Sequence, residues 1–104
     1  MLSMDEIKPA CTADTMVFTD HVRERMRERG IKYGDIESAI KNGEIIEQYV
    51  DDKPYPGCLI LGYSNENPLH VVASLDHNTL WIITAYTPTL AKWEEGYKTR
   101  KAAS

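Results

Sequence analysis

The pattern of apolar and polar positions separates a helical first half of the chain from a strand-rich second half. In the segment TDHVRERMRERG, apolar residues recur at helical spacing, and Thr19 or Asp20 can cap the first free amides. Gly30 suits the left-handed position that often follows the last turn of a helix. We therefore predict a helix over roughly residues 20–29.

A second, shorter helix is predicted in YGDIESAIKNG, with Asp35 as its N-cap and Asn42-Gly43 as its stop. After Gly43 the chain changes to short runs rich in β-branched and aromatic residues, which are typical of strands. Four strands are expected: EIIEQYV, CLILGY, LHVVASL and LWIITAY.

The segments between these strands, DDKPYPG, SNENP and DHNT, are rich in turn-forming residues and short enough to join antiparallel neighbours. A meander is the simplest order. Because CLILGY is almost continuously apolar, we expect both of its faces to be covered, with Leu59 and Leu61 facing the first helix. The predicted fold class is α+β: two N-terminal helices packed on a four-stranded antiparallel sheet, with a short C-terminal helix or tail after Pro88.

Residues 1–16 follow neither the helical nor the strand period, so we predict a flexible leader before one domain of residues 17–101. The chain of 104 residues is long enough for one hydrophobic core and too short for two. No apolar run approaches the ~20 residues that cross a bilayer, and the N-terminus does not resemble a signal peptide. We expect a cytoplasmic protein with no membrane partner.

Charge restricts the choice of partner. The net charge is −4, whereas binding to RNA phosphates rewards Lys and Arg, so an RNA partner requires a local basic patch. The first helix carries such a cluster, in which Arg25 and Arg29 adjoin the apolar arc while Arg23 and Arg27 point away from it. Arg25 and Arg29 either lay their stems along the sheet and pair with acids, or hold a phosphodiester between helix and sheet.

Three further side chains are candidates for proton transfer. His70 lies on the more polar face of its predicted strand, where a histidine is either a hydrogen-bonded structural residue or a general acid or base. His21 is one turn before Arg25 on the first helix. Tyr86, at the end of the last strand, is either a half-buried strand aromatic or a hydroxyl that reaches a ligand.

Metal and cofactor sites are not indicated. The histidines and the two cysteines are scattered singly, without the spacing of a zinc site, and Cys58 is expected to be a free buried thiol. The glycine-rich signatures of nucleotide-binding loops and the GxSxG of serine hydrolases do not occur. We therefore predict no metal and no cofactor.

The string HVRERMRERGIKYGDIESAIKNGEIIEQYVDDKPYPGCLILG, followed by PLHVVAS and WIITAYTP, resembles a bacterial domain-of-unknown-function family, the one numbered 4258. The resemblance covers about residues 18 to 100. It includes His21, Arg25, Arg29, His70 and Tyr86 in register. More distantly, two helices followed by an antiparallel sheet resemble the RelE-type and BrnT-type ribonuclease toxins, which are small and metal-independent and are usually neutralised by a protein antitoxin.

The distant resemblance implies a RelE-like domain that cleaves RNA without a metal. In that reading Arg25 and Arg29 bind the phosphate, His70 is the base or acid, and His21 or Tyr86 makes the second proton transfer. The acidic balance of the chain and the absence of a basic cluster on its strands depart from those toxins. The alternative is a non-catalytic module of the same fold that binds a protein or RNA. The two are distinguished by whether His70, Arg25 and Arg29 converge on one open groove.

Overall fold

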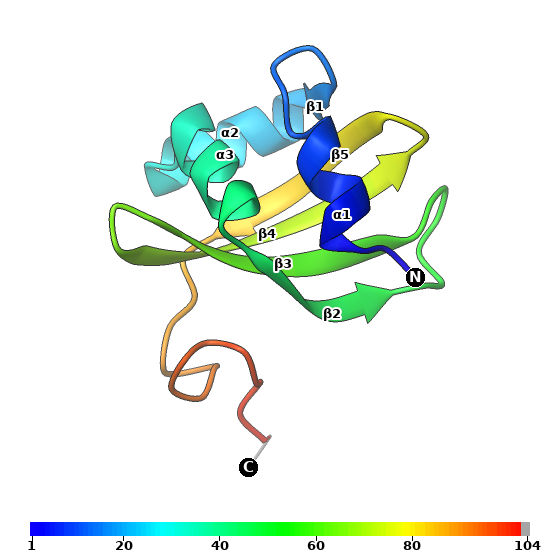
Figure 1. Cartoon of the computed structure of the whole chain (residues 1–104). Helices are drawn as coiled ribbons and strands as arrows, with labels where there is room; N and C mark the ends of the chain where they lie inside the picture. The colour runs from blue at the N-terminus through cyan, green and yellow to red at the C-terminus, as the bar shows by residue number, and fades with distance from the viewer. Residues whose placement is uncertain (103–104) are drawn as a thin grey trace.

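The computed structural model describes residues 1–102 and shows an α+β fold in which three α-helices lie on one face of a five-stranded mixed sheet (Figure 1). The helices are α1 (Met4–Ile7), α2 (Asp20–Arg29) and α3 (Tyr33–Lys41), with a 3-10 turn, η1 (Lys8–Ala10), after α1. The strands are β1 (Met16–Phe18), β2 (Glu44–Tyr49), β3 (Gly57–Ser64), β4 (Asn67–Asp76) and β5 (Thr79–Tyr86), in the spatial order β1-β5-β4-β3-β2. No helix in this part of the chain is long and apolar enough to cross a membrane.

The α+β class is confirmed, but the predicted four-stranded antiparallel sheet is wrong in one respect. Strands β2 to β5 form the expected meander, with β3 antiparallel to both β2 and β4, and β4 antiparallel to β5. The turn between β3 and β4 places Asn65 and Glu66 at positive φ, as a tight hairpin requires. A fifth strand, β1, pairs in parallel with β5, so the sheet is mixed.

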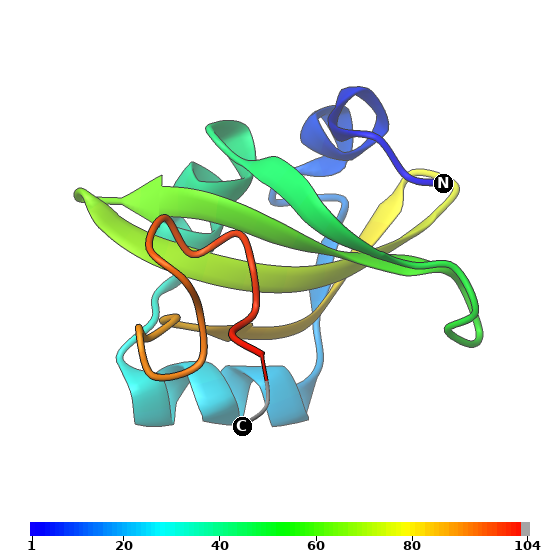
Figure 2. The same cartoon turned by 90° about the horizontal axis from the view of Figure 1, so that it is seen from below.

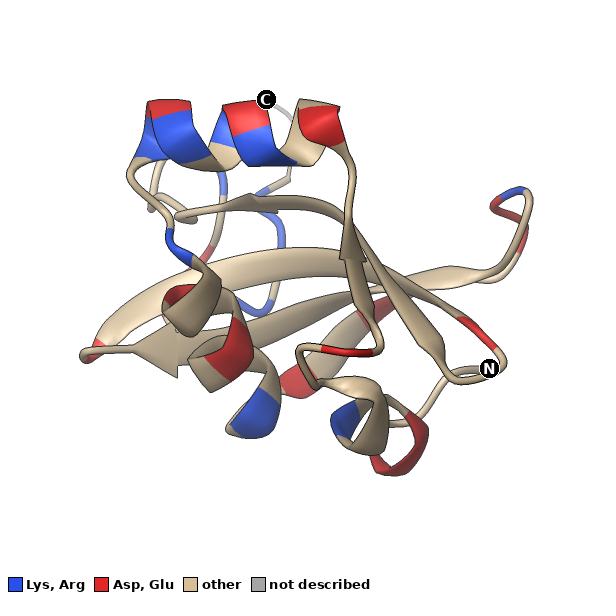
Figure 3. Ribbon diagram, turned by 90° about the horizontal axis from the view of Figure 1, so that it is seen from above, with Lys and Arg blue, Asp and Glu red and all other residues tan. Residues whose placement is uncertain are grey.

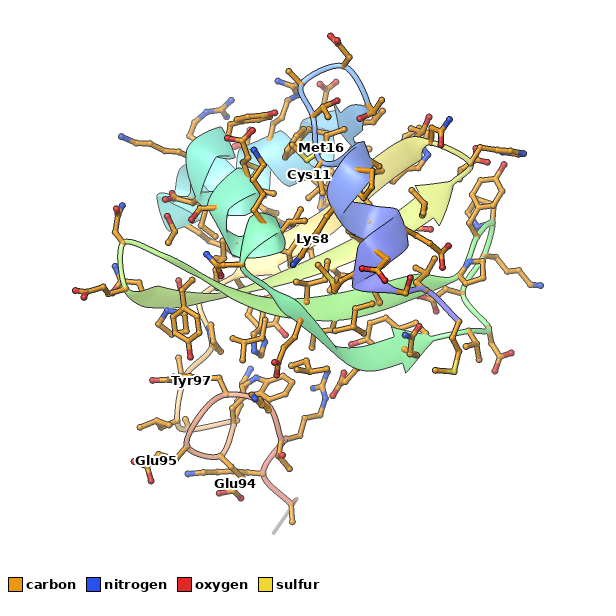
Figure 4. All side chains as sticks on the ribbon, viewed as in Figure 1. Lys8, Cys11, Met16, Glu94, Glu95 and Tyr97 are labelled. Carbon is orange, nitrogen blue, oxygen red and sulfur yellow. The ribbon has the colours of Figure 1, made fainter. Side chains whose placement is uncertain are left out.

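The predicted unstructured leader is also corrected. Residues 1–16 contain α1 and η1, and Met16 begins β1. Ile7 is fully buried and Cys11 is 2% exposed, so this segment contributes to the hydrophobic core. Figure 4 shows Cys11 and Met16 on the side of the sheet that carries the helices. The apolar residues of this segment are spread over short elements, so they leave no visible period.

Helix α2 has the predicted bounds. The Thr19 hydroxyl accepts a hydrogen bond from the Val22 amide at 3.2 Å, which caps the N-terminus, and Gly30 takes the left-handed conformation at φ 67°. Helix α3 begins earlier than predicted, because Lys32 rather than Asp35 is its N-cap. Asp35 lies in the first turn, and its carboxylate accepts the Lys32 amide at 2.8 Å.

The sheet has two different faces, which we call the helix side and the tail side. The helix side carries the main core, formed by buried residues that include Ile7, Val22, Met26, Ile36, Ile40, Cys58, Ile60, Val71, Leu80 and Ile82. Gly62 lies against the backbone of Ala39, which lets α3 approach β3 closely. Leu59 and Leu61 are buried but face the tail side, because Leu61 pairs across the sheet with His70, so their predicted orientation is wrong.

Residues 87–102, which we call the tail, lie on the opposite face from the helices (Figures 1 and 2). They contain turns and an isolated bridge between Trp93 and Arg100, so the tail alternative is correct and the C-terminal helix is not formed. Two ion pairs fasten the tail to β2: Lys98 to Glu44 at 2.8 Å and Arg100 to Glu47 at 2.8 Å. The tail thereby covers one end of this face of the sheet.

Candidate functional site: a cationic pocket under the tail

A pocket of about 450 Å³ opens where the end of β5, the C-terminal end of α2 and the tail meet. We call it the cationic pocket. It is lined by Arg29, Tyr86, Thr87, Pro88, Thr89, Lys92, Trp93 and Arg100. These residues include three cations and no Asp or Glu, although the chain as a whole is acidic. The pocket therefore offers local positive charge to an anion, mainly from Arg29 and Lys92, because Arg100 is paired with Glu47.

Arg29 reaches the pocket from the last turn of α2. Its Nη1 donates to the carbonyl oxygen of Ala85 at 2.9 Å and lies 3.4 Å from the Thr84 hydroxyl oxygen. Both partners are neutral, and one guanidinium group has five N–H donors. Arg29 is therefore held at the end of β5 while the charge of its guanidinium stays available to a ligand.

Arg100 enters the pocket from the tail and is held by three contacts. Its Nε and Nη2 donate to the two carboxylate oxygens of Glu47 at 2.8 and 3.1 Å, which fixes the guanidinium in a bidentate pair. Its guanidinium carbon is 4.7 Å from the centroid of the Trp93 ring. The hydrogen bond from Arg100 holds the pKa of Glu47 below its ordinary value, so this pair is ionised at neutral pH.

His70 lies directly behind the wall of the pocket and is fully buried. Its Nε2 is 2.8 Å from the carbonyl oxygen of Tyr97. A carbonyl can only accept, so Nε2 carries the proton. In the neutral ring Nδ1 is then an acceptor, and it receives the Tyr86 hydroxyl at 3.2 Å. The edge-on Trp93 ring, with its centroid 4.4 Å from that of His70, completes the enclosure.

Burial determines where the proton of this pair lies. It lowers the pKa of His70, with the Tyr97 carbonyl and Glu47 opposing the shift, and it raises the pKa of Tyr86. At neutral pH His70 is therefore neutral and Tyr86 is a protonated phenol. Of the two residues, Tyr86 lines the cationic pocket and His70 does not.

The structure brings only some of the five predicted site residues together. Arg29 and Tyr86 line the pocket, and His70 contacts it through Tyr86. Arg25 does not join them: its Nη1 pairs with Glu28 at 3.0 Å along α2. His21 is exposed in the first turn of the same helix, outside the pocket lining. The expected anion site of His70 with both arginines is therefore not formed as predicted.

Arg25 and Arg29, which adjoin the apolar arc of α2, are not both buried. Arg25 is half-buried, with 40% of its side chain exposed, whereas Arg29 is exposed, as are the outward-facing Arg23 and Arg27. Along α2, basic and acidic residues lie side by side (Figure 3), and Arg27 pairs with Glu24 at 2.7 Å. Most of the arginine cluster is thus neutralised within the helix.

Sequence reasoning missed Lys92 and Arg100. Both belong to the tail, where cations recur around Trp93 in the sequence KWEEGYKTRK. That recurrence was the available signal, but without the fold it does not indicate that the tail returns to the sheet beside Arg29. Within residues 1–102, no three His, Cys, Asp or Glu side chains come close enough to hold a metal ion.

No curated protein and no solved structure matches this chain. One family model does match, over residues 18–87. The match includes α2 with Arg29, and β4 and β5 with His70 and Tyr86, but ends before Lys92 and Arg100 of the tail. By this match the chain belongs to the family described as Domain of unknown function (DUF4258).

Proposed function

We propose that this protein is a metal-independent endoribonuclease that binds an RNA phosphodiester in the cationic pocket. The observation that supports it is that Arg29, Lys92 and Arg100 line one pocket together with Tyr86, whose hydroxyl is hydrogen-bonded to His70. Cations around a phosphate stabilise the charge that develops as the phosphorane forms, without a metal ion. The Tyr86–His70 pair supplies a group that can move a proton.

In the proposed reaction the ribose 2′-oxygen bonds to the adjacent phosphorus. Its proton passes to the oxygen of Tyr86 as the phenolic proton moves to Nδ1 of His70. The bond from phosphorus to the 5′-oxygen then breaks, and the same relay returns a proton to that oxygen. The products are a 2′,3′-cyclic phosphate and a 5′-hydroxyl. The Tyr97 carbonyl and Glu47 favour the transient His70 imidazolium.

In the proposed reaction Tyr86, and not His70, contacts the substrate. His70 is fully buried and both of its ring nitrogens are bonded, so it acts on the reaction through Tyr86. Arg29 keeps its proposed phosphate role, now with Lys92 and Arg100 in place of Arg25. The distant resemblance to RelE-type toxins supports the same reaction class, and it adds the expectation of a protein antitoxin as partner.

The alternative is a non-catalytic module that binds RNA in the same pocket. The burial of His70 favours it, because a histidine with two internal hydrogen bonds is also the usual form of a structural residue. Both functions require the cations of the pocket. Only the endoribonuclease requires the hydroxyl of Tyr86.

The deciding experiment is an RNA cleavage assay with excess chelator, with identification of the product ends. We expect the wild type to produce 2′,3′-cyclic phosphate ends. Tyr86→Phe removes the hydroxyl and should lower the rate by about 10² to 10⁴. Arg29→Ala should lower it by about 10² or more, because a charge beside the phosphorane is lost.

The matched control is Arg27→Ala, which removes an arginine from the same helix outside the pocket and should leave the rate unchanged. Thermal melts of all variants separate loss of activity from loss of fold. Cleavage that persists in Tyr86→Phe contradicts the proton-transfer role. RNA binding without cleavage by the wild type establishes the alternative.

A further inference from the structure

A second pocket, of about 140 Å³, adjoins the cationic pocket and shares Arg29 and Thr87 with it. We call it the polar pocket. Its remaining walls come from the start of α3, the β3–β4 hairpin and the two residues after α2. They are Gly30, Ile31, Asp35, Ser64, Asn65, Asn67, Pro68 and Leu69. Because Arg29 and Thr87 line both pockets, the two lie side by side at this end of the sheet.

The polar pocket differs from its neighbour in charge. Its carboxylate, Asp35, is held from two sides: Oδ1 accepts the Ser64 hydroxyl at 2.6 Å and Oδ2 accepts the Lys32 amide at 2.8 Å. The Ser64 hydroxyl, followed by the Lys32 amide, lowers the pKa of Asp35, so the group is ionised at neutral pH. Each carboxylate oxygen can accept more than one hydrogen bond. Asp35 is thus a fixed anion with acceptor capacity left.

An ionised carboxylate disfavours a second phosphate here, because the one cation of the lining, Arg29, is shared with the cationic pocket. These properties suit an uncharged group that donates hydrogen bonds and lies next to a phosphate. Asn65 and Asn67 are exposed at the rim, where their amides can both donate and accept. Pro68 and Leu69 provide apolar surface. Single-stranded RNA presents such a group in its unstacked bases, and carboxylates accept from the N4 amino group of cytosine.

We propose that the polar pocket is a nucleobase subsite in which Asp35 selects bases that carry an exocyclic amino group over uracil. The inference rests on the proposed function, because it assumes that the phosphate of an RNA strand occupies the cationic pocket. Arg29 then marks the boundary between a phosphate position and a base position. The cationic pocket supplies affinity for any sequence, and Asp35 supplies the preference among bases.

The test uses 2′-O-methyl hexamers, which lack the attacking hydroxyl and therefore bind without being cleaved. Oligo-C and oligo-U differ at C4 of the base, where cytosine carries an amino group that donates hydrogen bonds and uracil carries a carbonyl oxygen that accepts them. By fluorescence anisotropy the wild type should bind oligo-C about fivefold more tightly than oligo-U. Asp35→Asn should reduce this ratio to about one without weakening oligo-U. Arg29→Ala should weaken both hexamers by the same factor.

A third hexamer, built from N4,N4-dimethylcytosine, removes both N–H donors from the base without altering the protein. It should bind the wild type as weakly as oligo-U does. This comparison keeps the test decisive if Asp35→Asn does not fold, since Asp35 also helps to begin α3. Equal wild-type affinity for oligo-C and oligo-U overturns the subsite but leaves the proposed function intact. Absence of binding to all three hexamers overturns both.

Discussion

The two faces of the sheet are held by different forces. On the helix side, interlocking apolar residues from α1, α2 and α3 fill a continuous core. On the tail side, the tail is positioned by directed contacts: the ion pairs of Arg100 and Lys98, the Tyr97 carbonyl on His70, and the edge-on Trp93. Burial of apolar area stabilises the first face, whereas the geometry of a few polar groups determines the second.

The candidate site lies on the tail side, where fewer substitutions keep the side chains in position. The core on the helix side can tolerate many substitutions of one apolar residue by another of similar volume. The tail side carries groups whose positions are set by single hydrogen bonds, as preorganised chemistry requires. Disturbing the helix side should therefore affect the whole fold, and disturbing the tail side should act locally.

The largest expected effect is that of Gly62→Ala on the helix side. A β-carbon at this position would overlap the backbone of Ala39, which cannot move aside as a flexible side chain can. We expect a loss of about 4 kcal/mol or more in the free energy of unfolding, measured by urea denaturation. Gly34→Ala is the matched control, because its β-carbon meets nothing within 4 Å and α3 tolerates alanine. Similar stability of the two variants would contradict the close approach of α3 and β3.

A smaller effect is expected for Trp93→Ala on the tail side. Truncation of a buried tryptophan typically costs about 3 to 5 kcal/mol, but here we expect about 2 kcal/mol because the tail can leave the sheet while the core stays closed. Hydrogen exchange should rise in residues 90–100 and stay slow in β3 and β4. Ile36→Ala, on the helix side, should accelerate exchange in both regions. Faster exchange in β3 and β4 of Trp93→Ala would show that the faces are not independent.

The smallest effect concerns pH and His70. Burial lowers the pKa of folded His70, and an unfolded histidine titrates near 6.5. Below that pH the unfolded chain binds more protons than the folded one. The contribution of His70 to stability is therefore intact above about pH 6.5 and declines as pH falls towards the folded pKa, by at most about 1.4 kcal/mol per pH unit.

Urea denaturation at pH 7, 6 and 5 tests this expectation. His70→Gln should remove most of the decline, because an amide can donate to the Tyr97 carbonyl without titrating. His21→Gln changes an exposed histidine and should keep the wild-type decline. Equal decline in both variants would assign the pH dependence to other groups.

Helices α2 and α3 and the meander could be predicted because their signals are local. Thr19 and Gly30 mark the ends of α2, and short turn-forming segments separate the strands from β2 to β5. Arg29, His70 and Tyr86 were also identified as candidates from residue type and position. The sequence does not show in which direction each side chain points. Arg25 was therefore grouped with Arg29, although it pairs with Glu28 instead.

The errors arose where the signal is long-range or absent. Strand β1 has three residues and pairs with β5 near the other end of the chain. In β3 every position from Cys58 to Leu61 is apolar and buried, so alternation could not assign Leu59 and Leu61 to a face. Lys92 and Arg100 become neighbours of Arg29 only once the tail folds back on the sheet.

The pairing of β1 with β5 has a consequence for the order in which the chain can fold. The β2–β5 meander closes through contacts between neighbouring segments, which form quickly. Strand β1 must wait for its partner residues Leu80 to Ile82, which leave the ribosome long after residues 16–18. During synthesis the segment before β1, with the apolar side chain of Ile7, therefore cannot take its position in the core until residues 80–82 have been made.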